Sequence, residues 1–488
     1  MQRPITSKDK YLTGSIKKIA TVGVGGAAVQ VLAVALTPII TRLYSPEAFA
    51  GYALYWSIAS FFNCVSAFRF ETAIVLARSN DEAINVVAVS FGASIFNAAL
   101  CFLIAPLITY KLVPANMVGD IAAMLYFLPL LVIMTALNQI VASWLTRTQE
   151  FKKYAFSDVL TRLITYTTQI MLALAGMNSA LGLITGIVIG STLASSALAM
   201  WIVYSQGLSM FRIVEIREIM QVIVRYRNLP LYLTPYTLIE TLRERTAYFL
   251  IGAHGKNYDV GYYSIAARTL ALPVSLVTGA IRPIFFQKAA TLELKNLEDK
   301  VNFALRSIGC CVLPCWVVLL FHYDTLFAMV FGEQWRGAGI YAAILSVPAI
   351  PFLLGSWLDR SFDVTMRQRL HFGLEVLFAC LSLGGLAAGI LLFNEVLAAI
   401  AIQSGVATVY YSYYLMVIYR IAGFSLKRLA LSAFYWLSAG TITVGLGLLI
   451  SVFFNGIIGL LLFAITVALG VSLYGLQTWR QEKAFESE

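Results

Sequence analysis

The sequence predicts an all-α polytopic membrane protein with about 14 transmembrane helices. Of its 488 residues, 59% are hydrophobic and only 12% are charged, whereas a soluble chain has about 45–50% apolar and about 25% charged residues. A compact soluble domain of this length could not bury so much apolar surface. Apolar stretches long enough to cross a bilayer also recur along the whole chain. Lipid is therefore the expected environment of most outward-facing side chains.

The apolar stretches define the expected helices, because a helix needs about 20 apolar residues to cross the hydrocarbon core. The first stretch continues past the small residues Ala33 and Ala35, so we expect a retained helix rather than a cleaved signal. The expected spans lie near residues 19–40, 51–77, 84–108, 121–144, 160–177, 181–204, 229–251, 261–286, 303–331, 338–358, 372–393, 396–419, 430–453 and 457–478.

Basic residues indicate the orientation. Lys and Arg gather between alternate spans, and the opposite side has only Arg42, Lys111, Lys256 and Arg336. Because cytoplasmic loops are rich in basic residues, we expect both termini in the cytoplasm. The net charge of +10 comes from these short groups, and no basic run suggests a nucleic-acid partner. The six cysteines lie in apolar stretches and the three histidines are scattered, which argues against a metal site.

The spans suggest two lobes. Residues 1–204 would form an N-terminal lobe of six helices and residues 229–419 a C-terminal lobe of six. Residues 420–488 would add two further helices and a cytoplasmic tail. Residues 45–52 and 256–263, which precede the second and eighth spans, both end near a Gly-Tyr pair, as a duplicated unit would predict. Between the lobes, residues 205–228 alternate apolar and basic side chains, which predicts an amphipathic helix in the cytoplasmic membrane interface.

Several charged residues lie inside the expected spans, where each ionised side chain costs about 2.5–3.5 kcal/mol. They are Arg69, Glu71, Glu240, Arg243, Glu244, Arg245 and Arg268. In a regular helix Arg69 and Glu71 would point about 200° apart, so one of them would serve packing. Glu240, Arg243 and Glu244 share one helix face because they are three and four residues apart. The charges must therefore face water or one another.

Three interpretations of these charges are open. They could be ion pairs that lock helices together, or residues 238–246 could lie in a cytoplasmic loop. The third is a cationic cavity between the two lobes, for which arginine is suited because its planar fork binds phosphate oxygens and stays charged when partly desolvated. Pro230 and Pro235 beside the seventh span predict a kink there. No Walker motif is present, no catalytic arrangement is evident, and no cofactor is expected.

Four stretches carry a resemblance to a known family. TRLYSPEAFAGY at 41–52 and RFETAIVLA at 69–77 resemble the first outward loop and the second helix of Wzx-type flippases. VGYYS at 260–264 and FGEQW at 331–335 resemble later loops of the same proteins. The matches occur in the family's order between about residues 20 and 360. The chain is thus similar to the oligosaccharide-lipid flippases of the MOP exporter superfamily.

The resemblance implies two six-helix lobes around a central cavity that work by alternating access without ATP. It implies a cargo of undecaprenyl-pyrophosphate oligosaccharide, flipped across the bacterial inner membrane for O-antigen, capsule or exopolysaccharide synthesis. A polysaccharide polymerase and chain-length proteins would be further partners, besides membrane lipid. Arg42, Arg69 and Glu71 match charged positions of the family, whereas Arg268 matches only by location. Glu71, Glu240 and Glu244 are candidates for coupling to a proton or cation.

Rival functions remain open at this point. A multidrug antiporter of the same fold would favour an acidic cavity for organic cations, whereas arginines outnumber acids in these spans. A lipid II flippase also suits a cationic cavity, but the loop motifs favour the Wzx type. A membrane polymerase or ligase would need a large outward loop, which the expected spans leave no room for. A scaffold of an assembly complex would not need charges inside its spans.

Overall fold

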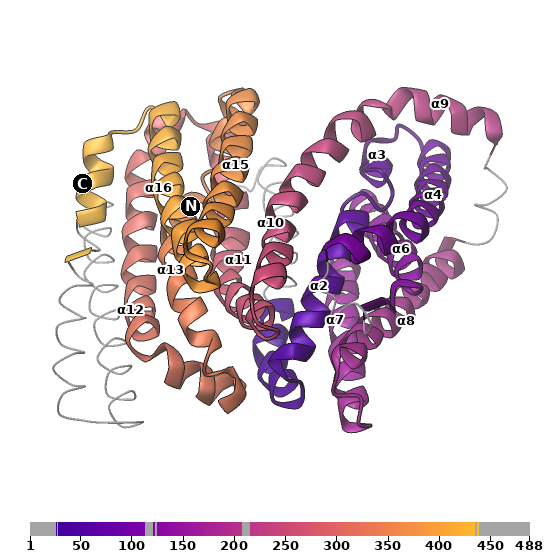
Figure 1. Ribbon diagram of the computed structural model, residues 1–488. Coiled ribbons are helices and arrows are strands. Elements are labelled where there is room, and N and C mark those ends of the chain that lie inside the picture. The colour runs from indigo at the N-terminus through magenta and orange to yellow at the C-terminus, as the bar shows by residue number, and fades with distance from the viewer. Residues whose placement is uncertain are drawn as a thin grey trace, which may run out of the picture. The chain divides into compact units, whose positions relative to one another are not determined.

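Helices dominate the structure. Figure 1 shows the computed structural model of the chain, in which residues 26, 28–112, 121–122, 124–206, 215–434 and 437–438 are described. These residues form helices, turns and short connections, with no β-strand among them. The expected all-α fold is confirmed.

Seven of the described helices are long and apolar enough to cross a membrane. They are Asn80–Lys111, Leu128–Arg147, Ala180–Trp201, Asp259–Ala289, Ala338–Gly355, Gln368–Phe393 and Val396–Ala422, and Ala28–Leu43 and Trp316–Phe331 are shorter apolar helices. The expected span near 430–453 lies largely, and that near 457–478 wholly, outside the described residues. The total of 14 spans therefore stays a prediction.

The chain divides into two compact units. The first runs to Ser264 and includes Asn394–Val396, and the second comprises Ile265–Phe393 and the residues from Leu397 on. The first unit contains Ala28–Leu43, α2 (Pro46–Asn63), α3 (Ala73–Leu76), α4 (Asn80–Leu112), α6 (Leu128–Arg147), α7 (Phe151–Leu174), α8 (Ala180–Gln206), α9 (Ile216–Tyr226) and α10 (Thr234–His254). The second contains most of α11 (Asp259–Thr291), α12 (Glu298–Phe331), α13 (Ala338–Gly355), α14 (Ser361–Val364), α15 (Gln368–Phe393) and α16 (Val396–Ala422). The boundary between the two compact units thus lies inside α11. The division into two duplicated six-helix lobes stays a prediction.

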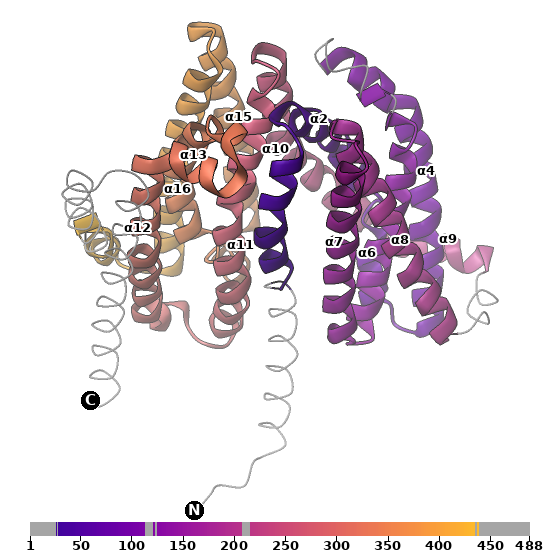
Figure 2. The ribbon, with the colours of Figure 1, turned by 90° about the horizontal axis from the view of Figure 1, so that it is seen from below.

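Small residues set the close packing of the first unit. Figure 2 shows α6, α7 and α8 side by side. A Cβ atom at Gly186 of α8 would clash with Gln169 of α7, and one at Gly190 would clash with the backbone of Thr165. The Tyr44 hydroxyl donates to the Gln169 carbonyl oxygen at 2.8 Å. Without a hydrophobic force between helices in lipid, such close contact and internal hydrogen bonds hold helices together.

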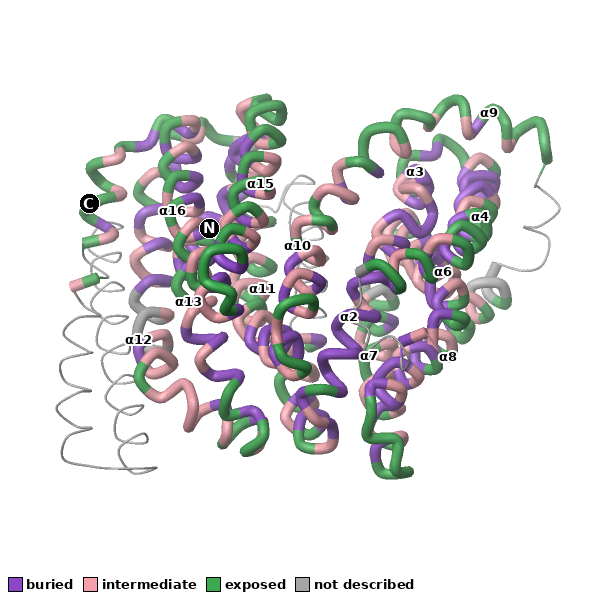
Figure 3. The backbone as a smooth tube through the Cα atoms, viewed as in Figure 1, coloured by how far each residue is buried: buried purple, intermediate pink, exposed green. Residues whose placement is uncertain are grey.

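The outer side of α4 is apolar and exposed (Figure 3). Phe102, Leu103, Leu107 and Tyr110 have exposed fractions of 54%, 68%, 67% and 78%. A contiguous apolar surface of this kind marks contact with a partner or a membrane. On a chain of this composition it is the face that we expect lipid to cover.

Aromatic side chains fill the core of the second unit. Phe378 stacks on Tyr410 with ring centroids 4.3 Å apart, and Phe285 meets Trp357 edge to face at 5.6 Å. Arg282 of α11 donates to Asp359, which follows α13, in a two-bonded ion pair whose Nε–Oδ1 distance is 2.9 Å. This pair ties the end of α11 to the end of α13.

The helical residues 426–434, which follow α16, contact α12. Ser432 accepts a hydrogen bond from Arg306 Nε at 3.1 Å and donates to Asn302 Oδ1 at 3.2 Å. The Tyr419 hydroxyl of α16 donates to the same Asn302 oxygen at 3.0 Å. The helix that begins after Gly423 is therefore held to the second unit through polar side chains of α12.

The second expected span, residues 51–77, is not one continuous helix, and that expectation is wrong. α2 ends at Asn63, and a 3-10 turn η1 (Phe70–Thr72) leads into the short α3. Phe68 and Arg69 have left-handed backbones with φ of 49° and 63°. The interruption contains neither proline nor glycine, so the usual sequence signals of a break are missing. We call residues 64–69 the helix break.

The linker helix α9 packs against the rest of the first unit. Val222 is 3% exposed and joins a core formed by α3, α4 and α6, whereas Ile216 on another face is 83% exposed. One apolar face of α9 is therefore covered by protein, and its expected place in the cytoplasmic membrane interface stays a prediction.

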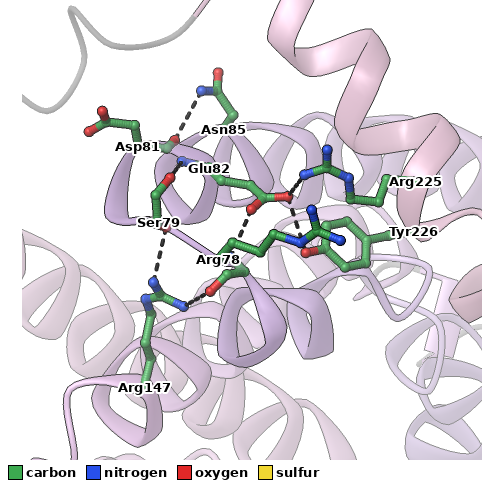
Figure 4. A network of polar contacts seen from close by, with 9 residues as sticks. Arg78, Ser79, Asp81, Glu82, Asn85, Arg147, Arg225 and Tyr226 are labelled. Carbon is green, nitrogen blue, oxygen red and sulfur yellow. Dashed lines mark hydrogen bonds and ion pairs between the residues drawn. The ribbon is translucent and has the colours of Figure 1, made fainter.

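Glu82 at the start of α4 binds the C-terminal end of α9 through Arg225 and Tyr226 (Figure 4). Its Oε1 pairs with the Arg225 guanidinium and accepts from the Tyr226 hydroxyl at 3.2 Å, while Oε2 accepts from the Arg78 backbone N–H at 2.8 Å. The hydrogen bond and the charge of Glu82 raise the pKa of Arg225 further above its usual value. We call Glu82, Arg225 and Tyr226 the linker clamp.

Arg147 at the end of α6 caps α3 in the same network (Figure 4). Its guanidinium donates to the carbonyl oxygens of Ile74 at 3.1 Å, Ala77 at 2.6 Å and Ser79 at 3.0 Å. The last carbonyls of a helix have no partner inside the helix, and Arg147 supplies one. Arg147 and the linker clamp therefore fix α3, α4, α6 and α9 to one another at one end of the first unit.

We predict that Glu82→Ala frees α9 from the first unit. The change removes the acceptor for both Arg225 and Tyr226, so the covered face of α9 should open more often. A cysteine placed at Val222, in a variant without the native cysteines, should react with a maleimide several-fold faster when Glu82 is replaced.

Two controls accompany this measurement. A cysteine at the exposed Ile216 should react at one rate in both backgrounds, and Glu218→Ala, which removes an exposed acid of α9, should leave labelling at 222 unchanged. Equal labelling at 222 with and without Glu82 would show that apolar packing alone holds α9.

Candidate functional site

Arg69 and Glu71 lie next to each other after the helix break. Arg69 Nη1 is 3.7 Å from Glu71 Oε1, and the two side chains are 29% and 5% exposed. The expectation that they point to opposite sides assumed a regular helix. The left-handed residues and the 3-10 turn remove that regularity, so the break itself brings the two charges together.

Amide side chains from neighbouring helices hold the break. Asn97 of α4 donates from Nδ2 to the carbonyl oxygens of Phe62 at 2.9 Å and Val65 at 3.2 Å. The Ser66 hydroxyl donates to Gln139 Oε1 of α6 at 2.8 Å. Inside a membrane each backbone group that leaves a helix needs another partner within the protein. Asn97 supplies such a partner, and Gln139 fixes a side chain of the broken segment.

The backbone at the break is in an unfavourable conformation. A left-handed conformation costs about 1–2 kcal/mol for a residue that has a Cβ atom, and Phe68 and Arg69 both adopt it. The Thr72 hydroxyl donates to the Arg69 carbonyl oxygen at 2.7 Å and so fixes the turn that follows. Backbone outliers of this kind concentrate at functional sites, which makes Arg69 a candidate on grounds independent of its charge.

Several buried polar atoms around the break have no hydrogen-bond partner within the described part of the chain. They are Arg69 Nε, Glu71 Oε2 and both side-chain polar atoms of Asn63. Glu71 is 4% exposed and Asn63 is 8% exposed. Buried polar atoms are costly unless they are hydrogen-bonded. The break therefore offers donors and acceptors for a polar ligand, a proton or water.

Residues 238–246 belong to α10, so the interpretation that placed them in a loop is wrong. Glu240 and Glu244 are exposed, while Arg243 and Arg245 are half-buried. Arg245 Nη2 is 3.8 Å from Glu244 Oε2, and the guanidinium lies 5.8 Å from the centre of the Tyr248 ring. The separations in the Arg69–Glu71 and Arg245–Glu244 pairs exceed a hydrogen bond, so each arginine is only partly neutralised.

The α10 charges lie near the helix break because α10 packs on α2. Phe61 and Phe249 stack with centroids 6.4 Å apart. Thr241, Arg69 and Glu240 all lie close enough to the Cys64 thiol to act on it electrostatically. The first unit thus brings Arg69, Glu71 and Glu240 to one region.

Arg42 and Arg268 occupy different places. Arg42 is exposed near the end of the helix Ala28–Leu43, just before α2. Arg268 is half-buried on α11 and belongs to the second unit. At the start of α11, a Cβ atom at Gly261 would collide with the Pro46 carbonyl oxygen. The first turns of α2 and α11, which carry the two similar loop sequences, are therefore in close contact.

The motif at 331–335 has a structural role. Gly332 has φ of 109°, a conformation that glycine tolerates and other residues rarely adopt, and Trp335 is fully buried. Arg336 donates to Glu333 Oε1 at 2.6 Å, and this hydrogen bond holds the pKa of Glu333 below its usual value. The motif turns the chain between α12 and α13, and its charges are already used within that turn.

The residues that shape the site are not the charges inside the expected spans. Asn63, Asn97 and Gln139 are uncharged, and Arg147 lies at the end of an expected span, where basic residues are common. A signal was present, because Asn97 and the adjacent pair Asn138 and Gln139 are amides inside otherwise apolar spans, and such residues face protein in a membrane. Among the described residues, no three His, Cys, Asp or Glu side chains come together as a metal site would require.

We predict that Asn97→Leu destabilises the first unit. The change removes the amide donor from the carbonyls of Phe62 and Val65, each of which then keeps a backbone N–H partner. A lost hydrogen bond costs about 0.5–1.5 kcal/mol, so the thermal midpoint of the purified protein should fall. Ser94→Ala on the same helix is the matched control, because the Ser94 hydroxyl donates to the Phe91 carbonyl of its own helix. An unchanged midpoint for Asn97→Leu would show that the Asn97 hydrogen bonds do not stabilise the break.

Comparison with known proteins places this architecture. A family described as "Polysaccharide biosynthesis protein" matches residues 39–339, while no curated protein sequence matches significantly. A lipid II flippase, MurJ in an inward closed conformation, superimposes with a TM-score of 0.74 at 13% identity over 94% of this chain and 99% of the other. An inward-facing multidrug resistance MATE transporter of the MOP superfamily gives 0.62 at 14% identity over 83% and 99%.

A MOP superfamily transporter from Pyrococcus furiosus, described as having a binding pocket of reverse polarity, gives a TM-score of 0.56 at 15% identity over 83% and 96%. These identities establish the fold alone, and the expected MOP fold is confirmed. The neighbours are flippases and transporters rather than enzymes, in agreement with the expectation for this chain. The chain belongs to the polysaccharide biosynthesis protein family, and its fold is that of the MOP-superfamily transporters.

Proposed function

We propose that this chain flips undecaprenyl-pyrophosphate-linked oligosaccharide repeat units across the bacterial inner membrane by alternating access. O-antigen, capsule or exopolysaccharide synthesis would use the product, with a polymerase and chain-length proteins acting downstream. Membership of the polysaccharide biosynthesis family supports a cargo that contains sugars. The observation that carries the proposal is Arg69, an incompletely neutralised arginine at a strained break inside an expected span.

A pyrophosphate cannot cross hydrocarbon unless protein groups replace the water it loses. Arginine replaces it well, because each charge-assisted hydrogen bond is worth about 1.5–3 kcal/mol and the guanidinium presents two donors side by side. The proposed head-group ligands are Arg42, Arg69, Arg243, Arg245 and Arg268. The half-buried state of Arg69, Arg243 and Arg245 supports their role, because a fully exposed arginine would keep its own water. The central cavity expected between two lobes stays a prediction.

Coupling to a proton or cation is part of the proposal. Glu71, Glu240 and Glu244 are the candidate groups, because acids inside spans mark proton and ion pathways. Two alternatives are retained. A lipid II flippase would use the same cationic groups on a related pyrophosphate lipid. A multidrug antiporter would need a site for organic cations, which the surplus of arginine at these positions disfavours.

We predict that Arg69→Ala or Arg268→Ala abolishes surface polysaccharide while the protein still inserts at normal levels. Either change removes a phosphate ligand, and in Arg69→Ala the buried Glu71 carboxyl, which loses its ion pair, can be neutralised by a proton. Lysine at position 69 should restore only part of the activity, because it keeps the charge and loses the planar fork. Surface polysaccharide and membrane abundance are measured together in cells that lack their own copy of the gene.

Lys111→Ala is the matched control, because Lys111 is an exposed basic residue at the end of α4. It should leave polysaccharide unchanged. If the arginines only lock helices together, the Ala variants should instead lose protein from the membrane. Normal polysaccharide in both Ala variants would contradict the proposal.

A further inference from the structure

We propose that Glu71 takes up a proton when the anionic head group binds Arg69, so that the proton is bound together with the cargo rather than exchanged for it. This inference rests on the proposed function, because it needs a phosphate-bearing cargo at Arg69. It assigns coupling to Glu71 and not to the exposed acids of α10. It also assigns the sign of the coupling.

The geometry singles out Glu71 among the three candidate acids. Its side chain is 5% exposed, whereas Glu244 is 51% exposed and Glu240 is exposed as well. Glu71 Oε1 lies 3.7 Å from Arg69 Nη1, and Oε2 is buried without a hydrogen-bond partner. A buried carboxylate held by one long ion pair depends on that pair for its charged state. An exposed acid such as Glu244 keeps water whatever its neighbour does.

The other elements packed on the η1 turn offer Glu71 no second cation. These elements are α3, α4, α6 and the π-helical turn η3 (Leu229–Leu233). Arg147 of α6 is bound to backbone carbonyls of α3 and the loop after it, and Glu82 of α4 is bound to Arg225. Asp81 of α4 and Tyr232 of η3 are exposed and are not cations. The cation Lys111 lies in the last turn of the 33-residue helix α4, at the opposite end from Asp81 and Glu82.

Two titratable groups outside those elements also lie near the break. Glu240 of α10 and Arg69 both act electrostatically on the Cys64 thiol. The charged group that acts on the Glu71 carboxylate is Arg69. The two side chains therefore form one coupled pair.

The exchange of partners at Arg69 follows from this arrangement. A phosphate oxygen that binds the guanidinium takes over the cation that is paired with Glu71 in the described part of the chain, and the carboxylate is left charged in a buried place. A proton from water then adds to a Glu71 oxygen, and no other bond changes. When the head group leaves, Arg69 returns and the proton dissociates. Linkage makes the effect reciprocal, so protonation of Glu71 strengthens anion binding by the same factor.

The test uses the full-length purified protein and farnesyl pyrophosphate as the probe. Calorimetric titrations between about pH 6 and about pH 8, in two buffers of different protonation enthalpy, give the affinity and the number of protons taken up. Glu71→Gln mimics the protonated acid. It should bind about tenfold more tightly than the wild type at the higher pH and equally at the lower pH. It should also take up fewer protons, because only the terminal phosphate of the probe still titrates.

Controls separate this inference from the proposed function. Glu395→Gln removes an exposed acid between α15 and α16 and should match the wild type throughout, whereas Arg69→Ala should lose binding. Equal affinity and equal proton uptake for the wild type and Glu71→Gln would overturn the inference and leave the proposed function standing. Absence of binding to both folded proteins would contradict the anionic cargo itself. Should Glu71→Gln not fold, proton uptake by the wild type no greater than that of the probe alone would overturn the inference.

Discussion

Satisfaction of backbone carbonyls at the break in the second helix is the constraint on which the candidate site depends. A chain that leaves helical geometry inside a membrane exposes polar backbone groups that lipid cannot solvate. Asn97 supplies donors to the carbonyls of Phe62 and Val65, and Gln139 fixes Ser66 from a second helix. With these partners the chain can hold two left-handed residues. The position of Arg69 and its pairing with Glu71 follow from that backbone.

A second set of polar contacts lies on the other side of the short helix α3, which follows the helix break. Arg147 caps α3, which directly follows the η1 turn, and the linker clamp joins α4 to α9. Between α9 and α10 the chain passes through the π-helical turn η3, which contains Pro230. Irregular turns with proline are where helices bend. The linker clamp holds α9 on α4, so we expect any bending between α9 and α10 to occur at η3.

The charged residues inside the expected spans fall into two kinds. Some are fully used in structure, such as Arg282 with Asp359 in the second unit, where a two-bonded pair joins two helices. Others are used incompletely, as with Arg69, Glu71 and Arg245, which keep buried polar atoms without partners in the described part of the chain. Buried polar atoms without hydrogen-bond partners distinguish candidates for binding from residues that only stabilise the fold.

The sequence by itself determined the all-α membrane fold, because hydrophobic length and charge distribution report the surrounding solvent directly. It also identified Arg69, Glu71 and the α10 charges as costly residues that need partners. Only the tertiary structure decided which partners they have. Sequence periodicity assumes a regular helix, and the break after Asn63 is created by Asn97 and Gln139, which are distant in sequence. The covered face of α9 was likewise decided by the apolar core of α3, α4 and α6 on which Val222 packs, and these helices lie far before α9 in the sequence. Such contacts depend on the packing of several helices, and no local pattern in the sequence carries them.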